Sequence, residues 1–494
     1  MIPLLVSLLL CSSVEASEGH PDRVTNLPGA PSEPSFPLYS GYIDVDIGDT
    51  RHSLFYVLAE AIHSDPLTSP LVLWLNGGPG GSSMFGFLLE HGPYLLDPKT
   101  GKLHYNDFSW NQYSNILYLD TPSNVGFSRA NKTIASYNDV TTAELNMIAV
   151  EAFMTRIHPR YANRDFFLTG ESYAGFYIPF LSRAILNGIQ RGEFTNDRFR
   201  GIAMGNAAMD YYSRSLSAAM QLFGMGMIPQ KYSAGLFKVW LKYQDGIVGD
   251  EDELDELDYK MDELFGYLVN ADNADDPTSF KPYVYNLHLA CEEEEDEEEW
   301  HIAPPANSIE CNLSNAPTDY MNRRDVQRAL HAIRNENTSV FGPLWIGINR
   351  PLFNVYDQRV DTVTLYEEIF EKAKDDFRIL FYSGDLDLAC PAIHVARGTS
   401  IIAKRNNLTE ASSAPKIWSY LGDFGGAQTS YKAPNSNITM DVLTVRGAGH
   451  LVTVNHPSRA FQIINNFLFS TESTIDYSQK ILRRNVDDAV KLLI

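Results

Sequence analysis

The feature that most constrains this chain is a tight turn between an apolar run and a segment able to form a helix. The apolar run 166–168 enters the sequence Gly-Glu-Ser-Tyr-Ala at 170–174, and residues 174–186 suit a helix. Small residues on each side of Ser172 let a strand and a helix pack closely around a strained corner that exposes the serine oxygen. The Tyr173 N–H would be unpaired at the start of the helix, where it can stabilise an oxyanion. This pattern predicts a nucleophile elbow, with an ordinary glycine-rich turn as the alternative.

A second glycine-rich turn follows another buried strand. Residues 71–75 are continuously apolar, which indicates a strand buried on both faces of a sheet. The strand runs into Asn-Gly-Gly-Pro-Gly-Gly-Ser-Ser at 76–83. A loop so rich in glycine presents bare backbone N–H groups, as an anion or oxyanion site requires. A phosphate site would look similar, but this loop lacks the lysine of a phosphate-binding loop.

Strands and helices alternate along most of the chain. The expected elements are a hairpin at 39–61, strands at 115–120, 201–206, 378–382 and 440–445, and helices at 137–157 and 459–469. This rhythm predicts an α/β fold with a mixed, mostly parallel central sheet and helices on both faces.

The last two expected strands end in turns that carry an acid and a histidine. Asp385 and Asp387 follow the first of them, and His450 follows the second. With Ser172 upstream, the order along the chain is Ser, Asp, His, which is that of α/β-hydrolases. Ser172 would attack a carbonyl, His450 would carry the proton, and the aspartate would hold the imidazole and stabilise its charge. Asp387 is the preferred acid because a proline follows it closely, as in the hydrolase turn, and Asp385 is the alternative.

The alternation breaks within 210–322. This stretch holds helical segments and a run of eight acidic residues at 292–299. We therefore expect an inserted, mostly helical cap, with the hydrolase core formed by 17–209 and 323–494. Eight adjacent acids repel one another, so we expect a solvated, extended loop there; a calcium, partner or processing site is the alternative.

The start of the chain predicts a secretory leader at 1–16. An apolar run too short to span a bilayer precedes small residues at positions that a signal peptidase reads, and a buried first helix is the alternative. Five acceptor sites for N-glycans agree with export. They are Asn131, Asn312, Asn337, Asn407 and Asn437. The leader and the acceptor sites together predict a protein of the secretory pathway, either lysosomal or extracellular. No later stretch suits a membrane anchor.

Charge and cysteine content limit the partners and the disulfides. The net charge of −23 would repel nucleic acid and anionic membranes, and it suits an acidic compartment. Loss of Cys11 with the leader leaves three cysteines, hence at most one disulfide. Cys291 and Cys311 are the expected pair, because together they would close a loop over the acidic run.

At these turns the chain resembles the serine carboxypeptidase family, a group of α/β-hydrolases that includes cathepsin A. The resemblance rests on Asn-Gly-Gly-Pro-Gly at 76–80, Gly-Glu-Ser-Tyr-Ala-Gly at 170–175, Ser-Gly-Asp-Leu-Asp at 383–387 and Gly-Ala-Gly-His at 447–450. It implies that the amides of Gly78 and Tyr173 form the oxyanion hole. It also implies a site for the terminal carboxylate of the substrate, formed by Asn76, Gly77, Glu90 and Glu171.

Carboxyl groups can bind a carboxylate only by sharing protons, and crowding of like charges raises their pKa values enough to allow this in mildly acidic solution. Binding should therefore weaken toward neutral pH. The resemblance implies a serine carboxypeptidase that releases residues from peptide carboxyl termini through an acyl-enzyme, with no metal or organic cofactor. Its partners would be peptides or proteins with a free carboxyl terminus, and pairing into a homodimer stays open. The alternatives are an esterase or acyltransferase on the same triad, or a protective scaffold for other lysosomal proteins.

The chain departs from the family pattern at three places. Gly81 stands where a cysteine is usual, Ser123 and Asn124 stand where small residues and glycine are usual, and Thr453 replaces a proline three residues after the histidine. These departures concern the rigidity of the glycine loop and the substrate pocket. Cys390 matches a free cysteine of the family and predicts sensitivity to mercurials.

Overall fold

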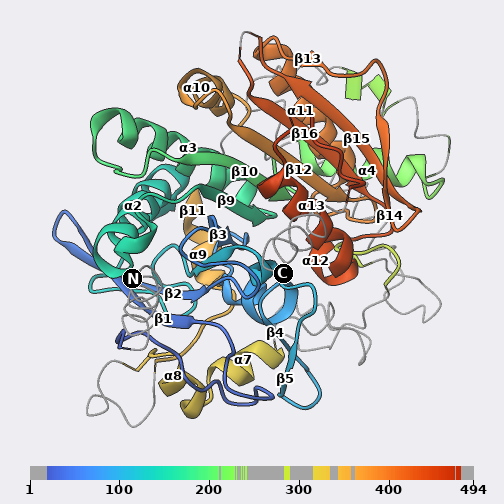
Figure 1. Cartoon of the computed structure of the whole chain (residues 1–494). Coiled ribbons are helices and arrows are strands. Elements are labelled where there is room, and N and C mark those ends of the chain that lie inside the picture. Colours follow the sequence, from blue (N-terminus) through green and yellow to red (C-terminus); the bar gives the residue numbers. More distant parts are fainter. Residues whose placement is uncertain are drawn as a thin grey trace, which may run out of the picture.

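The computed structural model describes most of the chain outside the predicted leader and cap (Figure 1). The described residues are 19–210, 213–228, 283–289, 315–333, 343–357, 362–434, 436–472 and 474–479, with isolated positions between 230 and 241. The predictions that lie outside them are the leader at 1–16, the acidic run at 292–299, the Cys291–Cys311 disulfide, and the acceptors Asn312 and Asn337.

The main sheet has twelve strands among the described residues, in the order β1-β2-β6-β3-β9-β10-β12-β16-β15-β13, with β14 beside β15 and β7 beside β2. Neighbours from β6 to β16 along this order are parallel. The ladders toward both ends of the sheet are antiparallel. The sheet is therefore mixed and parallel through its centre, and helices flank it (Figure 1), which confirms the predicted α/β class.

The strands of this sheet are β1 (Leu38–Ile47), β2 (Thr50–Ala59), β3 (Leu71–Leu75), β6 (Asn115–Leu119), β7 (Arg129–Ala130), β9 (Phe166–Glu171), β10 (Phe199–Gly205), β12 (Arg378–Gly384), β13 (Thr409–Glu410), β14 (Lys416–Tyr420), β15 (Asp423–Lys432) and β16 (Thr439–Val445). Two small sheets pair β4 (Tyr94–Leu96) with β5 (Leu103–Tyr105), and β8 (Tyr137–Asn138) with β11 (Tyr356–Asp357).

The helices are α2 (Asp139–Ala152), α3 (Ala174–Arg191), α4 (Ser213–Gly224), α7 (Asn315–Met321), α8 (Arg324–Ala329), α9 (Arg350–Val355), α10 (Leu365–Lys372), α11 (Ala392–Arg405), α12 (Val452–Asn455) and α13 (Pro457–Phe469). Short turns of other helix types are η1 (Gly86–Glu90), η2 (Trp110–Gln112), η3 (Phe153–Ile157) and η4 (Pro159–Tyr161).

Each face of the sheet carries its own hydrophobic core, which explains why every residue of the central strand β3 is buried. Leu73 and Leu75 belong to the core that includes α2, α3, α10 and α11. Val72 and Trp74 belong to the core that includes η1, α7, α8 and α13. Because side chains of a strand alternate between its two faces, a continuous apolar run fills both cores at once.

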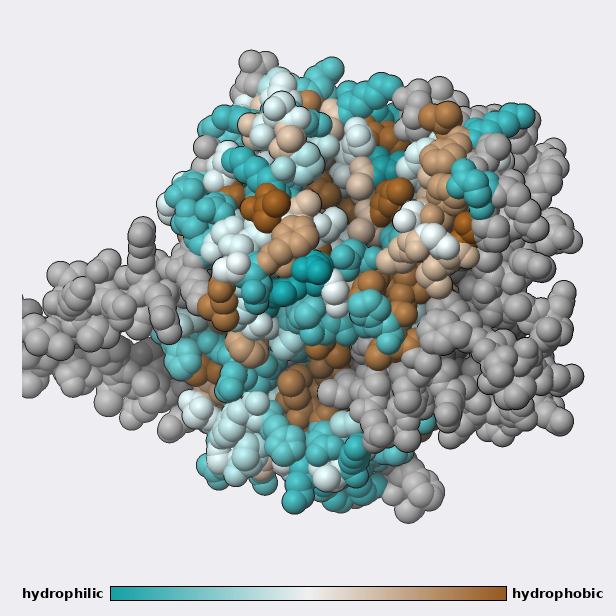
Figure 2. Space-filling model, turned by 90° about the vertical axis from the view of Figure 1, so that its right-hand side faces the viewer, coloured by the Kyte–Doolittle hydropathy of each residue, from teal (hydrophilic) through white to brown (hydrophobic). Residues whose placement is uncertain are grey.

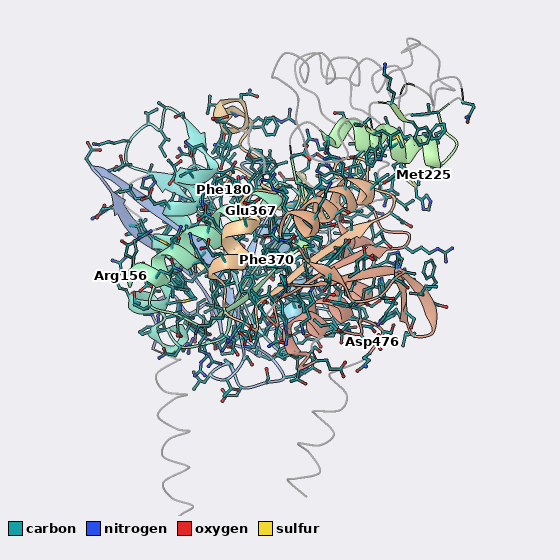
Figure 3. The ribbon with its side chains drawn as sticks, turned by 90° about the horizontal axis from the view of Figure 1, so that it is seen from above. Arg156, Phe180, Met225, Glu367, Phe370 and Asp476 are labelled. Carbon is teal, nitrogen blue, oxygen red and sulfur yellow. The ribbon has the colours of Figure 1, made fainter. Side chains whose placement is uncertain are left out.

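Two views show the outside of this arrangement. Figure 3, from above, places Phe180 of α3 near Glu367 and Phe370 of α10, helices that pack on each other, while Met225 after α4 lies across the molecule. The face in Figure 2 carries hydrophobic side chains in separate groups among hydrophilic ones. Within the part of the chain that the structure describes, no helix combines the length and apolar character needed to cross a bilayer.

Two helices differ from the expected boundaries. The helix expected over 137–157 starts at Asp139, because the Asn138 side chain accepts the Thr141 N–H as an N-cap, and it ends in the π-helical turn η3. The last helix starts at Pro457 rather than at 459, since a proline suits the first turn of a helix.

The described parts of the predicted insertion pack beside the turn that follows β12. Helix α4 contacts α11, and Leu287 joins a hydrophobic cluster with Leu386 and Leu388. The Leu287 N–H donates to the Leu386 carbonyl at 3.0 Å, and the Leu388 N–H donates to the Val284 carbonyl at 2.8 Å. Residues 283–289 therefore hold the turn that carries the predicted catalytic acid, while the boundaries 210–322 stay a prediction.

Candidate active site

Ser172 occupies the strained corner that its sequence predicts. It lies between β9 and α3 with a φ of 61°, a left-handed conformation that is uncommon for residues other than glycine. A Cβ added at Gly170 would come within 2.3 Å of the Leu75 carbonyl oxygen, so only glycine fits there. The Ser172 N–H donates to the Gly205 carbonyl and the Ser172 carbonyl accepts from the Ala208 N–H, both at 3.0 Å. The end of β10 thus holds the corner in place.

The glycine loop after β3 lies directly against this corner. A Cβ added at Gly77 would be 2.4 Å from the Tyr173 nitrogen and 2.8 Å from the Ser172 Cβ. Among the described residues, neither the Gly78 N–H nor the Tyr173 N–H has a hydrogen-bond acceptor. Two unpaired amides beside the half-buried serine hydroxyl are what an oxyanion hole requires.

The loop is fastened by hydrogen bonds around Gly81, the position at which the family resemblance implied a cysteine. The Gly81 N–H donates to the Gly77 carbonyl at 3.0 Å, and the Gly80 N–H donates to the Tyr177 hydroxyl at 3.2 Å. The Ser82 hydroxyl donates to Asp120 at 2.5 Å. The loop therefore contacts α3 and the end of β6, although position 81 carries no thiol.

His450 and Asp387 form a hydrogen-bonded pair. The His450 Nδ1 lies 2.7 Å from the Asp387 Oδ2, and both side chains are buried. Asp387 also accepts from the Asn206 amide at 2.8 Å and from the N–H groups of Ala389 and Cys390 at 2.8 and 3.0 Å. Four donors can satisfy an ionised carboxylate away from water.

Asp385, the alternative acid, has a different partner. Its carboxylate accepts the Gly447 N–H at 2.7 Å, and so it ties its own turn to the turn that carries the histidine. Burial raises the pKa of this carboxyl. The imidazole of His450 therefore hydrogen-bonds Asp387, whereas Asp385 hydrogen-bonds the backbone of the turn that carries His450.

The three predicted triad residues come from one edge of the sheet. Ser172, Asp387 and His450 follow the carboxyl ends of β9, β12 and β16, and β9-β10-β12-β16 are successive parallel strands. Asn206, at the end of β10, contacts Asp387, while Gly205 beside it holds Ser172. No described residue hydrogen-bonds the Ser172 hydroxyl; hydrogen bonds between a catalytic serine and its histidine are often long before substrate binds.

The predicted carboxylate-binding residues form a second buried group. The Asn76 amide donates to Glu90 at 2.9 Å and to Glu171 at 3.0 Å. The Asn76 oxygen is held by the Trp74 indole at 2.8 Å and by the Gly86 N–H at 3.0 Å. The sequence prediction named these members, and the structure brings the three polar side chains together beside the elbow.

Burial and mutual charge shift the two glutamates. Burial raises the pKa of Glu90, although hydrogen bonds from Asn76 and Thr453 act against it. Burial, followed by the charge of Glu90, raises the pKa of Glu171 well above its usual value. The two carboxyl groups also hydrogen-bond each other. Such a pair holds a proton at a pH where an exposed glutamate would be ionised.

Sequence reasoning missed three side chains that build this region. Thr453 donates to Glu90, Asn206 holds Asp387, and the Tyr177 hydroxyl accepts from the glycine loop. Asn206 carried a usable signal, because it directly follows a buried strand in the same way as the other site residues. Thr453 stood out only as a departure from the family pattern, with no partner indicated, and Tyr177 carried no signal.

Predicted modification sites and the free cysteine have contrasting surroundings. The acceptors Asn131, Asn407 and Asn437 are exposed, as glycan attachment requires. Cys390 is a free cysteine and is buried. Burial raises the pKa of the Cys390 thiol to about 12, which keeps it protonated and lowers its reactivity.

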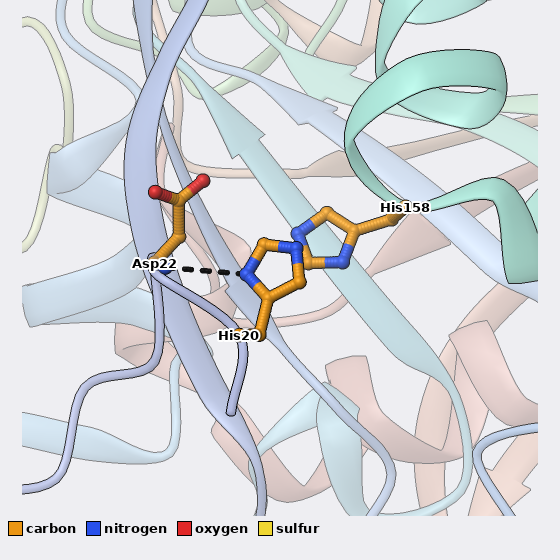
Figure 4. A group of neighbouring side chains, drawn as sticks. All are labelled: His20, Asp22 and His158. Atoms are coloured by element: carbon orange, nitrogen blue, oxygen red, sulfur yellow. Dashed lines mark hydrogen bonds between the residues drawn. The ribbon is translucent and has the colours of Figure 1, made fainter. Parts of the chain in front are cut away.

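A second polar cluster lies at the N-terminal arm, the segment 19–37 that precedes β1, where His20 and Asp22 meet His158 (Figure 4). The imidazoles stack with ring centroids 4.4 Å apart and planes at 12°. Because an imidazole binds a metal in its ring plane, two nearly parallel stacked rings cannot direct lone pairs at one ion. The His20 Nδ1 already accepts the Asp22 N–H at 3.2 Å, and its Nε2 lies 3.1 Å from the Ile157 carbonyl. The cluster attaches the arm to the core.

Comparisons with known proteins agree on one family. The sequence profile of the serine carboxypeptidases matches residues 28–470. The lysosomal protective protein of Mus musculus is 29% identical, covering 94% of this chain and 98% of its own. Serine carboxypeptidase-like 46 of Arabidopsis thaliana is 32% identical, covering 95% and 96%. A prohormone-processing carboxypeptidase of Saccharomyces cerevisiae has a similar fold, with a TM-score of 0.69, 21% identity, and coverage of 91% and 95%.

Proposed function

The chain belongs to the serine carboxypeptidase family of hydrolases, as its motifs predicted. On that premise, we propose that it cleaves the last peptide bond of peptides at acidic pH. The proposed reaction proceeds through an acyl-enzyme on Ser172. The observation that carries this proposal is the His450–Asp387 pair, 2.7 Å apart, at the same sheet edge as the strained serine.

The chemistry follows from the positions of these groups. Asp387 occupies the His450 Nδ1, so Nε2 is the nitrogen that takes the proton of Ser172 as its oxygen attacks the carbonyl. The N–H groups of Gly78 and Tyr173 stabilise the oxyanion. His450 then gives the proton to the departing amine, which leaves as a free amino acid. Water attacks the acyl-enzyme by the same steps, and Ser172 regains its proton.

Recognition of the carboxyl terminus uses the second buried group. The leaving residue carries a carboxylate, and the N–H of Gly77 can donate to it, while Asn76 holds the two glutamates beside it. Glu171 holds a proton at mildly acidic pH and can donate it in a further hydrogen bond. As the pH rises, Glu171 loses this proton and repels the substrate instead. An enzyme built in this way favours acidic conditions.

Digestion of N-blocked dipeptides at pH 4.5 and 7.5, followed by mass spectrometry, tests the proposal. The wild type should release the terminal amino acid faster at pH 4.5, and a serine-directed phosphonate should label Ser172. Ser172→Ala should lose both properties. Ser182→Ala is the matched control, because this buried serine of α3 donates only to the Ile178 carbonyl. Activity that survives in Ser172→Ala would overturn the assignment, and acyl transfer without hydrolysis would favour an acyltransferase.

We also propose export to the lysosome. The predicted leader at 1–16 supports it, together with the exposed acceptors and the likeness to the mouse lysosomal protective protein. The name of that relative supports a second candidate function, the protection of other lysosomal proteins. If Ser172→Ala still protects other lysosomal proteins, the protective role is favoured over catalysis.

A further inference from the structure

Thr453 contacts the carboxyl pair directly. It lies in α12, three residues after His450, and its side chain is buried. Its hydroxyl donates to the Glu90 Oε2 at 2.8 Å.

The hydrogen bonds of the pair are unequal. Glu90 accepts from Asn76 on Oε1 and from Thr453 on Oε2, so both of its oxygens have a donor. Among the described residues, Glu171 accepts from Asn76 alone, apart from its contact with Glu90. Because donors stabilise an ionised carboxylate, the negative charge belongs on Glu90 and the proton on Glu171.

Other titratable groups around the pair favour the same distribution. A protonated imidazole at His450 stabilises an ionised Glu90, whereas the charge of Asp387 favours a protonated Glu171. The remaining neighbours are neutral, because burial raises the pKa values of Tyr118 and Tyr382 and lowers the pKa of His91. Within the described residues around the pair, Thr453 is therefore the neutral hydrogen-bond donor that Glu90 has and Glu171 lacks.

We propose that Thr453 is a positioning residue that holds the negative charge on Glu90 and thereby confines binding of the substrate carboxylate to acidic pH. This inference rests on the proposed function of the pair. When the substrate carboxylate enters, it lies beside Glu90 and Glu171, so three carboxyl groups are together. Binding without charge repulsion then requires one further proton from solvent. A Glu90 stabilised as an anion takes up that proton only at lower pH.

The test is the pH dependence of KM for an N-blocked dipeptide with a free carboxyl terminus, from pH 4 to 8. The KM of each variant is divided by the KM of the same variant at pH 4. Thr453→Val removes the donor at nearly constant volume, so the midpoint of the KM increase should move up by about one pH unit, equivalent to about tenfold in proton affinity. Thr453→Ser keeps the hydroxyl and should keep the wild-type midpoint. Thr399→Val is the matched control, since this buried threonine of α11 donates only to the backbone of its own helix.

An unchanged or lowered midpoint in Thr453→Val would overturn the role of Thr453. Thr453→Ala gives a second measurement if the valine variant does not fold, and its midpoint should also move up. A wild type that releases no amino acid at any pH would instead refute the proposed function. A wild type whose KM rises with pH, together with an unmoved midpoint in both variants, would refute the inference on Thr453 alone.

Discussion

Two groups of buried carboxyls lie at the same edge of the sheet and differ in the donors that reach them. Asp387 receives hydrogen bonds from His450, Asn206 and two backbone N–H groups. Glu171 receives one from Asn76, and the charge of Glu90 raises its pKa. Both groups are shielded from water, so burial alone does not distinguish them.

The difference shows how one site can hold an anion and a protonated acid side by side. A buried carboxylate needs donors to replace the water that it has lost. Where donors are plentiful, as around Asp387, the charge is supported and can stabilise an imidazolium. Where a second carboxyl takes the place of donors, as around Glu171, a proton is the cheaper way to relieve the repulsion. The first arrangement suits proton transfer, and the second suits binding of an anion in acid.

The largest expected effect tests the donor-rich group. Asp387→Asn should lower kcat by about 10⁴, because the amide no longer supports the imidazolium and favours the wrong tautomer of His450. Single-turnover rates at saturating substrate measure this loss separately from binding.

Asp385→Asn is the control for that variant. It keeps an acceptor for the Gly447 N–H, so kcat should fall by about tenfold or less. A loss in Asp385→Asn equal to that in Asp387→Asn would mean that the orientation of the imidazole does not determine the rate.

The next effect tests the donor-poor group. Glu171→Ala should raise KM at pH 4.5 by about 100-fold, because it removes a hydrogen-bond donor to a charged group. Glu171→Gln keeps a donor that cannot ionise, so its KM in acid should change far less. The rise of KM that remains toward neutral pH then reports the titration of Glu90. If Glu171→Gln raises KM in acid as much as Glu171→Ala does, a hydrogen bond from Glu171 does not contribute to binding of the substrate carboxylate.

The smallest effect concerns Asp139, a buried carboxyl that supports the elbow. It accepts from the hydroxyls of Tyr173 and Tyr356, at 3.1 and 3.0 Å, and burial raises its pKa from 3.8 to about 7. Since the folded-state pKa exceeds the unfolded value, its contribution to stability is complete below pH 3.8 and is lost as the pH rises through 7.

Asp139→Asn should remove that dependence. Between pH 4.5 and pH 6, the free energy of unfolding of the variant should gain about 2 kcal/mol relative to the wild type, as measured by urea denaturation. Asp107→Asn, at an exposed position, should show no such relative gain. A constant difference between Asp139→Asn and the wild type across this range would show that Asp139 is ionised in the folded protein.

Much of the site was predictable because its residues follow apolar runs that can only be buried strands. The turn at Ser172, the glycine loop and the turn at His450 each begin where such a run ends, so the order of motifs gives both the sheet and the edge that carries them. The start of α2 was missed by two residues, because its position depends on the side chain of Asn138.

The pairing of Thr453 with Glu90 was not predictable from sequence. The two residues are 363 positions apart, and their contact exists only because α12 packs on η1. The sequence marked Thr453 as a departure from the family pattern but gave no reason for it. Local patterns predict where a chain turns; which polar groups then meet is decided by packing between distant elements.

The loop beside Ser172 is fastened at Gly80, Gly81 and Ser82 through amide and hydroxyl contacts rather than a covalent bridge. Sulfur oxidation is therefore not needed to shape this side of the catalytic centre. The hydrogen bonds that fasten the loop should persist in reducing solution, where a disulfide at the same place would open.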